Sequence, residues 1–237
     1  MRAQSHVVGV ALMLGLAVVA LGALTVGVGS VVDSQASNAD TTRVGEQLGT
    51  ALEAVERTGR ATHQLSFTEG TLWTADRTLR ILENETVTAE HDVDALVFES
   101  GDRRVASLAG AVVRGQGENV WLLEEPPITS SNRTDVLVVG VPILNADHVA
   151  VGGQGGVTTT LRTNVSHKQT DLGVSEFAVA VETETPEAFE RYFERHGATT
   201  QRQTFAGDET ESVVATFPGQ RQAYLVVHTL ELEVHGG

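Results

Sequence analysis

The sequence predicts an α+β protein in which an N-terminal transmembrane helix precedes a mostly antiparallel, β-rich, sandwich-like outer domain with one packed helix. Three observations lead to this class. Residues Val7 to Val32 contain no ionisable side chain. From about residue 64, short runs of β-type residues, several of them alternating apolar and polar, follow one another between turn signals. One later segment, residues 186–196, instead has the spacing of a helix.

The apolar run is long enough to cross a membrane as one helix. Its 26 residues would extend about 39 Å at a rise of about 1.5 Å each, against a hydrocarbon core of about 30 Å. Arg2 is the one positive charge near the run. By the positive-inside rule, the N-terminus stays in the cytoplasm and the remaining chain lies outside. We therefore expect a single-pass protein of the cell membrane with an extracellular C-terminal domain.

The opening residues, MRAQSHVVGVALMLGLAVVALGALTVGVG, resemble the N-termini of haloarchaeal type IV pilin-like and archaellin-like proteins. In those families a very short basic leader ending in Arg-Ala or Arg-Gly precedes a Gln-Ser start and a long apolar helix. The resemblance covers about 30 of the 237 residues. It implies a class III signal, cleaved by a prepilin-type peptidase between Ala3 and Gln4. The fifth residue of the processed chain is Val8, where bacterial type IV pilins carry Glu, so an assembly contact that depends on this Glu is not available.

Small residues within the apolar run indicate where another helix would approach. Ala11 with Gly15, and Ala23 with Gly27, each form a small-xxx-small pair, which lets two helices pack closely in a membrane. We expect self-association, or association with other pilin-like subunits, through these positions. The sequence leaves open whether a filament forms and whether the leader is removed or retained as part of a plain anchor.

A second helical pattern follows the apolar run. After the polar stretch DSQASNADTT, an apolar stripe recurs at three- and four-residue spacing, formed by Val44, Leu48, Leu52 and Val55. Asp40 or Thr41 is placed to cap the start of this helix, and Gly59 to end it. The polar stretch and Gly45 leave open whether this helix continues the membrane span or is separated from it. The predicted organisation is a leader (1–3), a transmembrane or assembly helix (4–32), a helical stalk (33–62) and a β-rich extracytoplasmic domain (63–237).

The outer domain contains eleven predicted strands and one predicted helix. The strands are residues 79–82, 86–90, 95–99, 104–109, 120–123, 136–141, 157–163, 177–182, 213–217, 223–227 and 230–234. The helix has Thr185 as N-cap, Pro186 as its first residue and Gly197 after its last turn. Its aromatic face, Phe189, Tyr192 and Phe193, is expected to pack on the sheet.

Composition narrows the class of protein. There are 31 acidic and 16 basic residues, giving a net charge of −15, and Lys168 is the one lysine. This balance argues against nucleic acid as a partner, because phosphate binding needs a cationic patch. Diffuse negative charge with almost no lysine is what we expect of a protein kept soluble at high salt. With no cysteine, the chain forms neither disulfides nor thiolate metal sites.

The sequence offers modification motifs but no catalytic signature. Asn84, Asn132 and Asn164 each begin an N-x-S/T sequon, and an outward-facing domain would expose them to glycosylation. No P-loop, nucleophile elbow or histidine pair at helical metal-ligand spacing is present. We therefore expect no enzyme, no cofactor and no metal site.

These observations together indicate a pilin-like cell-surface glycoprotein of archaeal, halophilic type. It is expected to be inserted in the membrane and to assemble through its N-terminal helix for adhesion or surface structure. The alternative that the sequence leaves open is a stand-alone, membrane-anchored extracytoplasmic module that binds a ligand or a partner.

Overall fold

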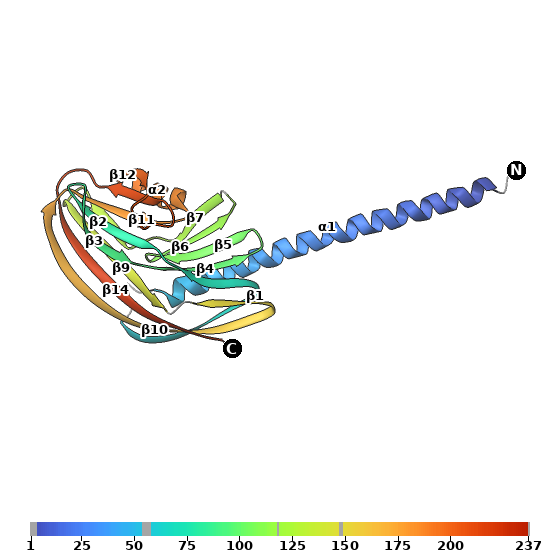
Figure 1. Ribbon diagram of the computed structural model, residues 1–237, viewed down its shortest axis with the longest axis horizontal. Coiled ribbons are helices and arrows are strands. Elements are labelled where there is room, and N and C mark those ends of the chain that lie inside the picture. Colours follow the sequence, from blue (N-terminus) through green and yellow to red (C-terminus); the bar gives the residue numbers. More distant parts are fainter. Residues whose placement is uncertain (1–3, 54–57, 118, 147–148, 237) are drawn as a thin grey trace.

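A long helix joined to a β-rich domain makes up the molecule (Figure 1). The computed structural model describes residues 4–53, 58–117, 119–146 and 149–236. Helix α1 runs from Gln4–Ala51, 48 residues without interruption. Its N-terminal part projects away from the domain as a rod, and its C-terminal part lies against the strands. Leader residues 1–3 lie outside the described residues.

The predicted transmembrane identity of residues 4–32 stays a prediction. The backbone of this region is helical from Gln4 onward, but the side chains of residues 4–12 and 20–33 lie outside the described residues. Among the helices that are described, none combines the length and the apolar character that a membrane span requires.

Two open, mostly antiparallel sheets form the domain. The larger one, sheet A, has the order β7-β6-β5-β4-β1-β10-β14-β9-β8, in which only β14 and β9 are parallel. Its strands are β1 (Gly59–Ala75), β4 (Ala95–Ser100), β5 (Arg103–Leu108), β6 (Ala111–Gln116), β7 (Asn119–Glu124), β8 (Ile128–Ser131), β9 (Val136–Ala146), β10 (Ala150–Ser175) and β14 (Arg221–Gly236). The smaller one, sheet B, has the order β12-β13-β11-β2-β3. Its strands are β2 (Thr78–Glu83), β3 (Thr86–Asp92), β11 (Phe177–Glu182), β12 (Thr199–Gln203) and β13 (Ser212–Thr216).

Helix α2 (Pro186–Arg195) confirms the second predicted helix. Thr185 occupies the N-cap position, although its side chain makes no capping hydrogen bond. At the other end, Gly197 adopts a positive φ of 79°, and the Ala198 N–H donates to the Phe193 carbonyl at 3.0 Å. This closing bond belongs to a Schellman motif, which requires a residue that tolerates positive φ. The aromatic face of α2 is buried as expected, with Phe189, Tyr192 and Phe193 at most 1% exposed.

Two buried clusters hold these layers together. One contains residues of both sheets and the aromatic face of α2. The other joins Val44, Leu48 and Leu52 of α1 to the opposite face of sheet A, where Phe67, Phe98 and other apolar side chains meet them. The predicted stripe of the stalk is therefore buried at these three positions, while Val55 lies outside the described residues.

The stalk differs from the prediction at both of its ends. Neither Asp40 nor Thr41 caps a new helix, because α1 continues through the polar stretch. Polar side chains do not interrupt the helix there: Thr41 and Thr42 donate their hydroxyls to the carbonyls of Ser37 and Asn38 one turn earlier, both at 2.8 Å. At the other end, α1 stops at Ala51 and β1 begins at Gly59. The β-rich domain therefore starts before residue 63.

Gly45 allows α1 to approach the strands closely. A Cβ at this position would lie 2.7 Å from Leu123 Cδ1 of β7 and 3.7 Å from Val105 Cγ1 of β5. Since real Cβ contacts at 2.7 Å are essentially never seen, a larger side chain requires the Leu123 side chain to turn away or α1 and β7 to move apart. The glycine that suggested a break in the helix is instead a packing position.

We predict that Gly45→Val destabilises the domain by about 1–3 kcal/mol through overpacking, although glycine is normally the weaker helix former. The measurement is thermal unfolding of the full chain by circular dichroism. The matched control is Thr50→Val, which places the same side chain on the exposed face of the same helix. Equal melting temperatures for the two variants would contradict the close approach.

Candidate functional site

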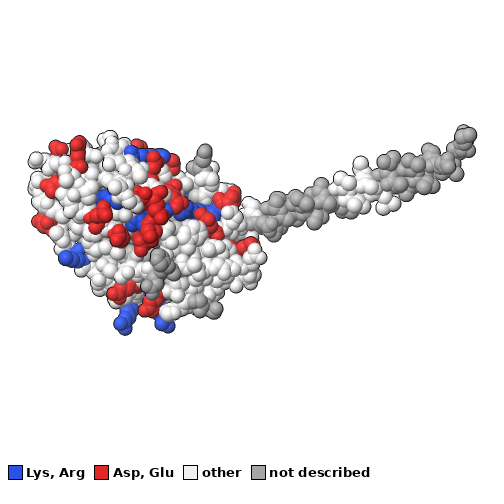
Figure 2. Space-filling view, in the orientation of Figure 1, with Lys and Arg blue, Asp and Glu red and all other residues white. Residues whose placement is uncertain are grey.

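The projecting part of α1 is the first candidate, because it exposes large apolar side chains. Met13, Leu14, Leu16, Val18 and Val19 are 62% to 78% exposed. We call residues 13–19 the exposed segment. No atom lies within 4 Å of where a Cβ of Gly15 would be. Figure 2 shows that the charged side chains gather on the domain and that the described part of the rod carries none. Apolar surface of this kind marks a contact with another helix, a protein or a lipid.

The place where α1 enters the domain is the second candidate. We call this junction the neck: residues 37–41 of α1 with the side chains that bind them. Arg114 of β6 donates to both the backbone carbonyl and the side-chain oxygen of Asn38, at 3.1 and 2.6 Å. Arg103 of β5 donates to the same Asn38 oxygen at 3.2 Å. Burial, and secondarily the charge of Arg103, lowers the pKa of Arg114. The two arginines thus bind one turn of the helix through Asn38.

Asp40 joins the neck to the edge of β1. Its carboxylate, which is 2% exposed, accepts hydrogen bonds from the backbone N–H groups of Thr68 at 2.8 Å and Glu69 at 3.1 Å. Nη1 of Arg43, one turn further along α1, lies 3.4 Å from Oδ1 of Asp40. The register of β1 against β10 shifts between Phe67 and Glu69. Asp40 therefore satisfies the donors that this bulge leaves on the open side of β1.

Gln47 extends the same arrangement about two turns further along the helix. Its side-chain oxygen accepts the N–H of Ser66 at 3.0 Å. Within the described residues, β1 pairs with β4 only from Thr71 to Ala75. Side chains of α1 thus cover the part of the β1 edge that no strand pairs. The result is a helix that is fixed in direction relative to the sheet, with the exposed segment beyond the neck.

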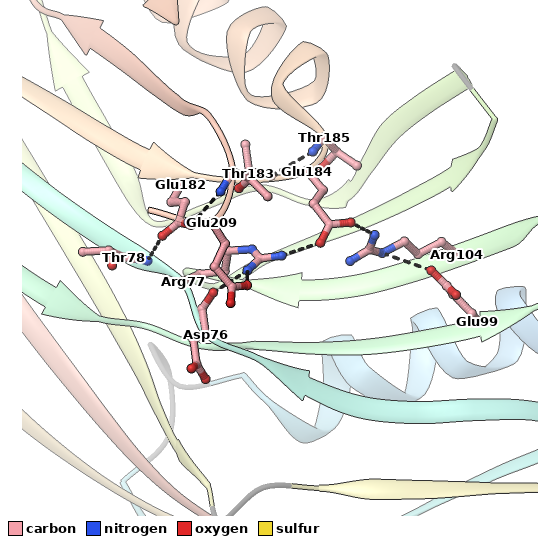
Figure 3. Close-up of polar contacts among 11 residues, drawn as sticks. Asp76, Arg77, Thr78, Glu99, Arg104, Glu182, Thr183, Glu184, Thr185 and Glu209 are labelled. Carbon is pink, nitrogen blue, oxygen red and sulfur yellow. Dashed lines mark hydrogen bonds and ion pairs between the residues drawn. The ribbon is translucent and has the colours of Figure 1, made fainter. Parts of the chain in front are cut away.

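A separate ion-pair network links the two sheets (Figure 3). Arg77, between β1 and β2, is 4% exposed at its side chain and pairs with Glu184 and with Glu209. Glu184, which precedes α2, also pairs with Arg104 of β5. Burial lowers the pKa of Arg104. The neighbouring charge of Glu99 acts in the opposite direction, and that of Arg77 lowers the pKa further. Because a buried charge that loses its partner is costly, this network fixes the corner between the sheets.

Glu182 strengthens this corner from the end of β11. Its buried carboxylate accepts three backbone N–H groups, those of Thr78 at 3.0 Å, Glu209 at 2.8 Å and Thr210 at 3.1 Å. These bonds connect the end of β11 to the start of β2 and to residues 209–210. The arrangement is that of a structural clamp rather than of a reacting pair.

The three sequon asparagines have different surroundings. Asn84 is exposed in the turn between β2 and β3, and Asn132 is exposed in the turn after β8. Asn132 also accepts a bond from Arg221 at 2.6 Å. Asn164, by contrast, lies within β10, half-buried, and its amide donates to Glu231 at 2.9 Å. Asn164 directly follows the predicted strand 157–163, but it does not lie in a turn, because β10 continues to Ser175.

The predicted processing and packing residues are only partly described. Ala3 lies outside the described residues, and Gln4 is the first residue of α1. Of the four packing residues, the structure describes the surroundings of Gly15 alone; the side chains of Ala11, Ala23 and Gly27 belong to the range that is not described.

Sequence reasoning missed a histidine pair. His167 of β10 and His228 of β14 face one another directly in the antiparallel register, and their Nδ1 atoms are 2.8 Å apart. No local pattern could reveal this pair, since 61 residues separate its members. Within the described ranges, no group of three or more His, Asp or Glu side chains could hold a metal ion.

Comparison with known proteins gives one family match, which covers both the helix and the domain. A family model described as a family of unknown function (DUF7289) matches residues 2–233. That range includes α1 and nearly all of the β-rich domain, so the family comprises the two parts together. No curated protein and no solved structure matches the chain.

We predict that Asp40→Ala lowers the free energy of unfolding by about 3 kcal/mol, because it leaves two backbone donors of β1 without their acceptor. Denaturant unfolding measures this loss, and amide hydrogen exchange at Thr68 and Glu69 should become faster. Asp102→Ala is the control, because the exposed Asp102 bonds only to Gln116 in the described contacts. If the two variants lost equal stability, Asp40 would not support the β1 edge.

Proposed function

We propose that this chain, which belongs to the DUF7289 family, is a membrane-inserted, pilin-like cell-surface protein that assembles through its N-terminal helix. The observation that carries the proposal is the exposed segment. Five large apolar side chains, each at least 62% exposed, project on a rod beyond the domain. In water this surface would be unfavourable. Lipid, or a bundle of similar helices, is the environment that removes it from water.

The sequence of α1 supports the same environment for its whole N-terminal part. From Val7 to Val32 there is no ionisable residue, and Asp33 is the first charge after the run. The neck begins only four residues later, at Ser37. At about 1.5 Å per residue, the domain would therefore stand within about 10 Å of the end of the apolar run. Arg2 places the N-terminus on the cytoplasmic side and the β-rich domain outside.

The neck supports assembly because it fixes the helix in the domain. A subunit whose helix turned freely would present its outer domain at random, whereas α1 is held by Asn38 and Asp40 within one turn and by Gln47 about two turns further along. Packing of neighbouring helices would then place the outer domains in a regular array. Adhesion or surface structure, with glycans on exposed sequons such as Asn84 and Asn132, is the role that we propose for that array.

A cleft favours the second candidate, a stand-alone membrane-anchored binding module. It lies between the end of α1 and strands β5 to β7, and has a volume of about 510 Å³. Apolar side chains such as Leu48 and Val112 line it, and Glu46, Glu53, Glu124 and Glu125 stand around them. A cleft with this lining suits a ligand with apolar and cationic parts. In this case the helix serves as an anchor only.

The first test is the N-terminal mass of the protein, taken from membranes and from sheared surface material. We expect the chain to start at Gln4 in both fractions, and at Met1 or Arg2 in cells that lack the prepilin-type peptidase. An intact leader in cells with the active peptidase contradicts processing. A Gln4 start that occurs in membranes and never in surface material identifies the anchored module instead.

The second test addresses packing of the helix. We predict that Ala11→Leu with Gly15→Leu abolishes self-association, because larger side chains keep two backbones apart. Cross-linking in membranes measures this. The control is Ala17→Leu with Val28→Leu, which helical periodicity places on a different side of α1 from both small-residue pairs. Unchanged cross-linking in the first variant would contradict the contact.

A further inference from the structure

The His167–His228 pair lies on the face of sheet A that α1 covers. Leu161 and Val165 of β10, and Leu230 of β14, belong to the cluster that packs on α1. Successive residues in a strand point to opposite faces, so His167 and His228 share the face of these neighbours. His228 is 5% exposed, whereas His167 is exposed. One imidazole is thus fixed in the domain and the other is open to solvent.

The two rings meet through the same atom. Nδ1 of His167 and Nδ1 of His228 are 2.8 Å apart, and the ring planes are nearly perpendicular, at 82°. A single proton can lie between these nitrogens, donated by one ring to the lone pair of the other. Burial, followed by the neighbouring His167, lowers the pKa of His228.

This separation is close to that of two histidines on one metal ion. Bonds of about 2.0–2.1 Å from Zn²⁺ to histidine nitrogen, at angles between a right angle and a tetrahedral one, place the nitrogens about 2.9–3.4 Å apart. The observed 2.8 Å needs a small opening, and the rings must also turn so that both lone pairs converge on the ion; the exposed His167 ring is the one with room to move. Imidazole suits Zn²⁺, Ni²⁺ and Cu²⁺ better than it suits Mg²⁺ or Ca²⁺.

A further contact orients the exposed ring. Nε2 of His167 lies 2.9 Å from the hydroxyl of Thr58, which precedes β1. A partner on the second ring nitrogen is what histidine ligands normally have, since it fixes the ring and its tautomer. The net charge of −15 also raises the local concentration of cations around the domain.

We propose that His167 and His228 form a binding site for one divalent transition-metal ion, Zn²⁺, Ni²⁺ or Cu²⁺, held through the two Nδ1 atoms. The ion replaces the shared proton but lies to one side of the line between the two nitrogens, and water completes its coordination from the exposed side of His167. Both histidines lie on strands β10 and β14 rather than on α1. The proposed metal site is therefore tested independently of the proposed assembly through α1.

The test uses the untagged full chain in detergent, titrated with Zn²⁺ by calorimetry and with Cu²⁺ by electron paramagnetic resonance. We expect saturable binding of one ion per chain, with nitrogen coupling in the Cu²⁺ spectrum. Binding should weaken as the pH is lowered, because protonated imidazole cannot coordinate a metal.

Two variants and one control decide the outcome. His167→Gln and His228→Gln should each lose saturable binding, whereas His235→Gln, an exposed histidine on the same strand β14, should keep it. His167 is exposed, so its variant should melt at the same temperature as the parent without metal, which separates loss of the site from loss of the fold. Equal binding by His167→Gln and the parent, or binding by neither, overturns the proposal.

Discussion

The open edge of β1 is the constraint on which the rest of the structure depends. Sheet A is opened between β1 and β4, which pair only from Thr71 to Ala75. The backbone donors of the preceding residues need acceptors, because an unpaired buried N–H is costly. Asp40 and Gln47 supply them from α1. The helix therefore completes the sheet, and its position there sets the direction in which the exposed segment leaves the domain.

Local patterns predicted much of the fold because they depend on neighbouring residues. The stripe of Val44, Leu48 and Leu52, the caps of α2 and most short strands needed only spacing and turn residues. The continuity of α1 could not be predicted in this way. The polar stretch before Thr41 resembles a linker until Arg103 and Arg114, more than 60 residues later, are placed beside Asn38. Strands β10 and β14 were likewise predicted as shorter pieces, because glycines and polar residues within them resemble turns.

The candidate sites likewise divide into those formed by neighbouring residues and those formed by residues distant in sequence. The apolar run and the junction between Ala3 and Gln4 are contiguous in sequence, so they could be proposed without a structure. Asp40 was predicted, with Thr41 as the alternative, to cap a helix, because a short carboxylate before an apolar stripe is typical of a cap; this prediction was wrong, since α1 continues through it. Its actual partners are backbone groups of Thr68 and Glu69, which only the tertiary fold brings near. The His167–His228 pair depends entirely on the register between two strands.

The chemistry of the neck suits the acidic, lysine-poor composition. Exposed ion pairs such as Arg195 with Glu125, whose side chains are 62% and 52% exposed, are weakened by salt and contribute little. Asp40, by contrast, is 2% exposed and binds backbone N–H groups. Charge-assisted bonds of this kind are short-range, and a buried one is screened much less. A helix held in this way keeps its direction at ionic strengths that remove the stabilisation of the surface pairs.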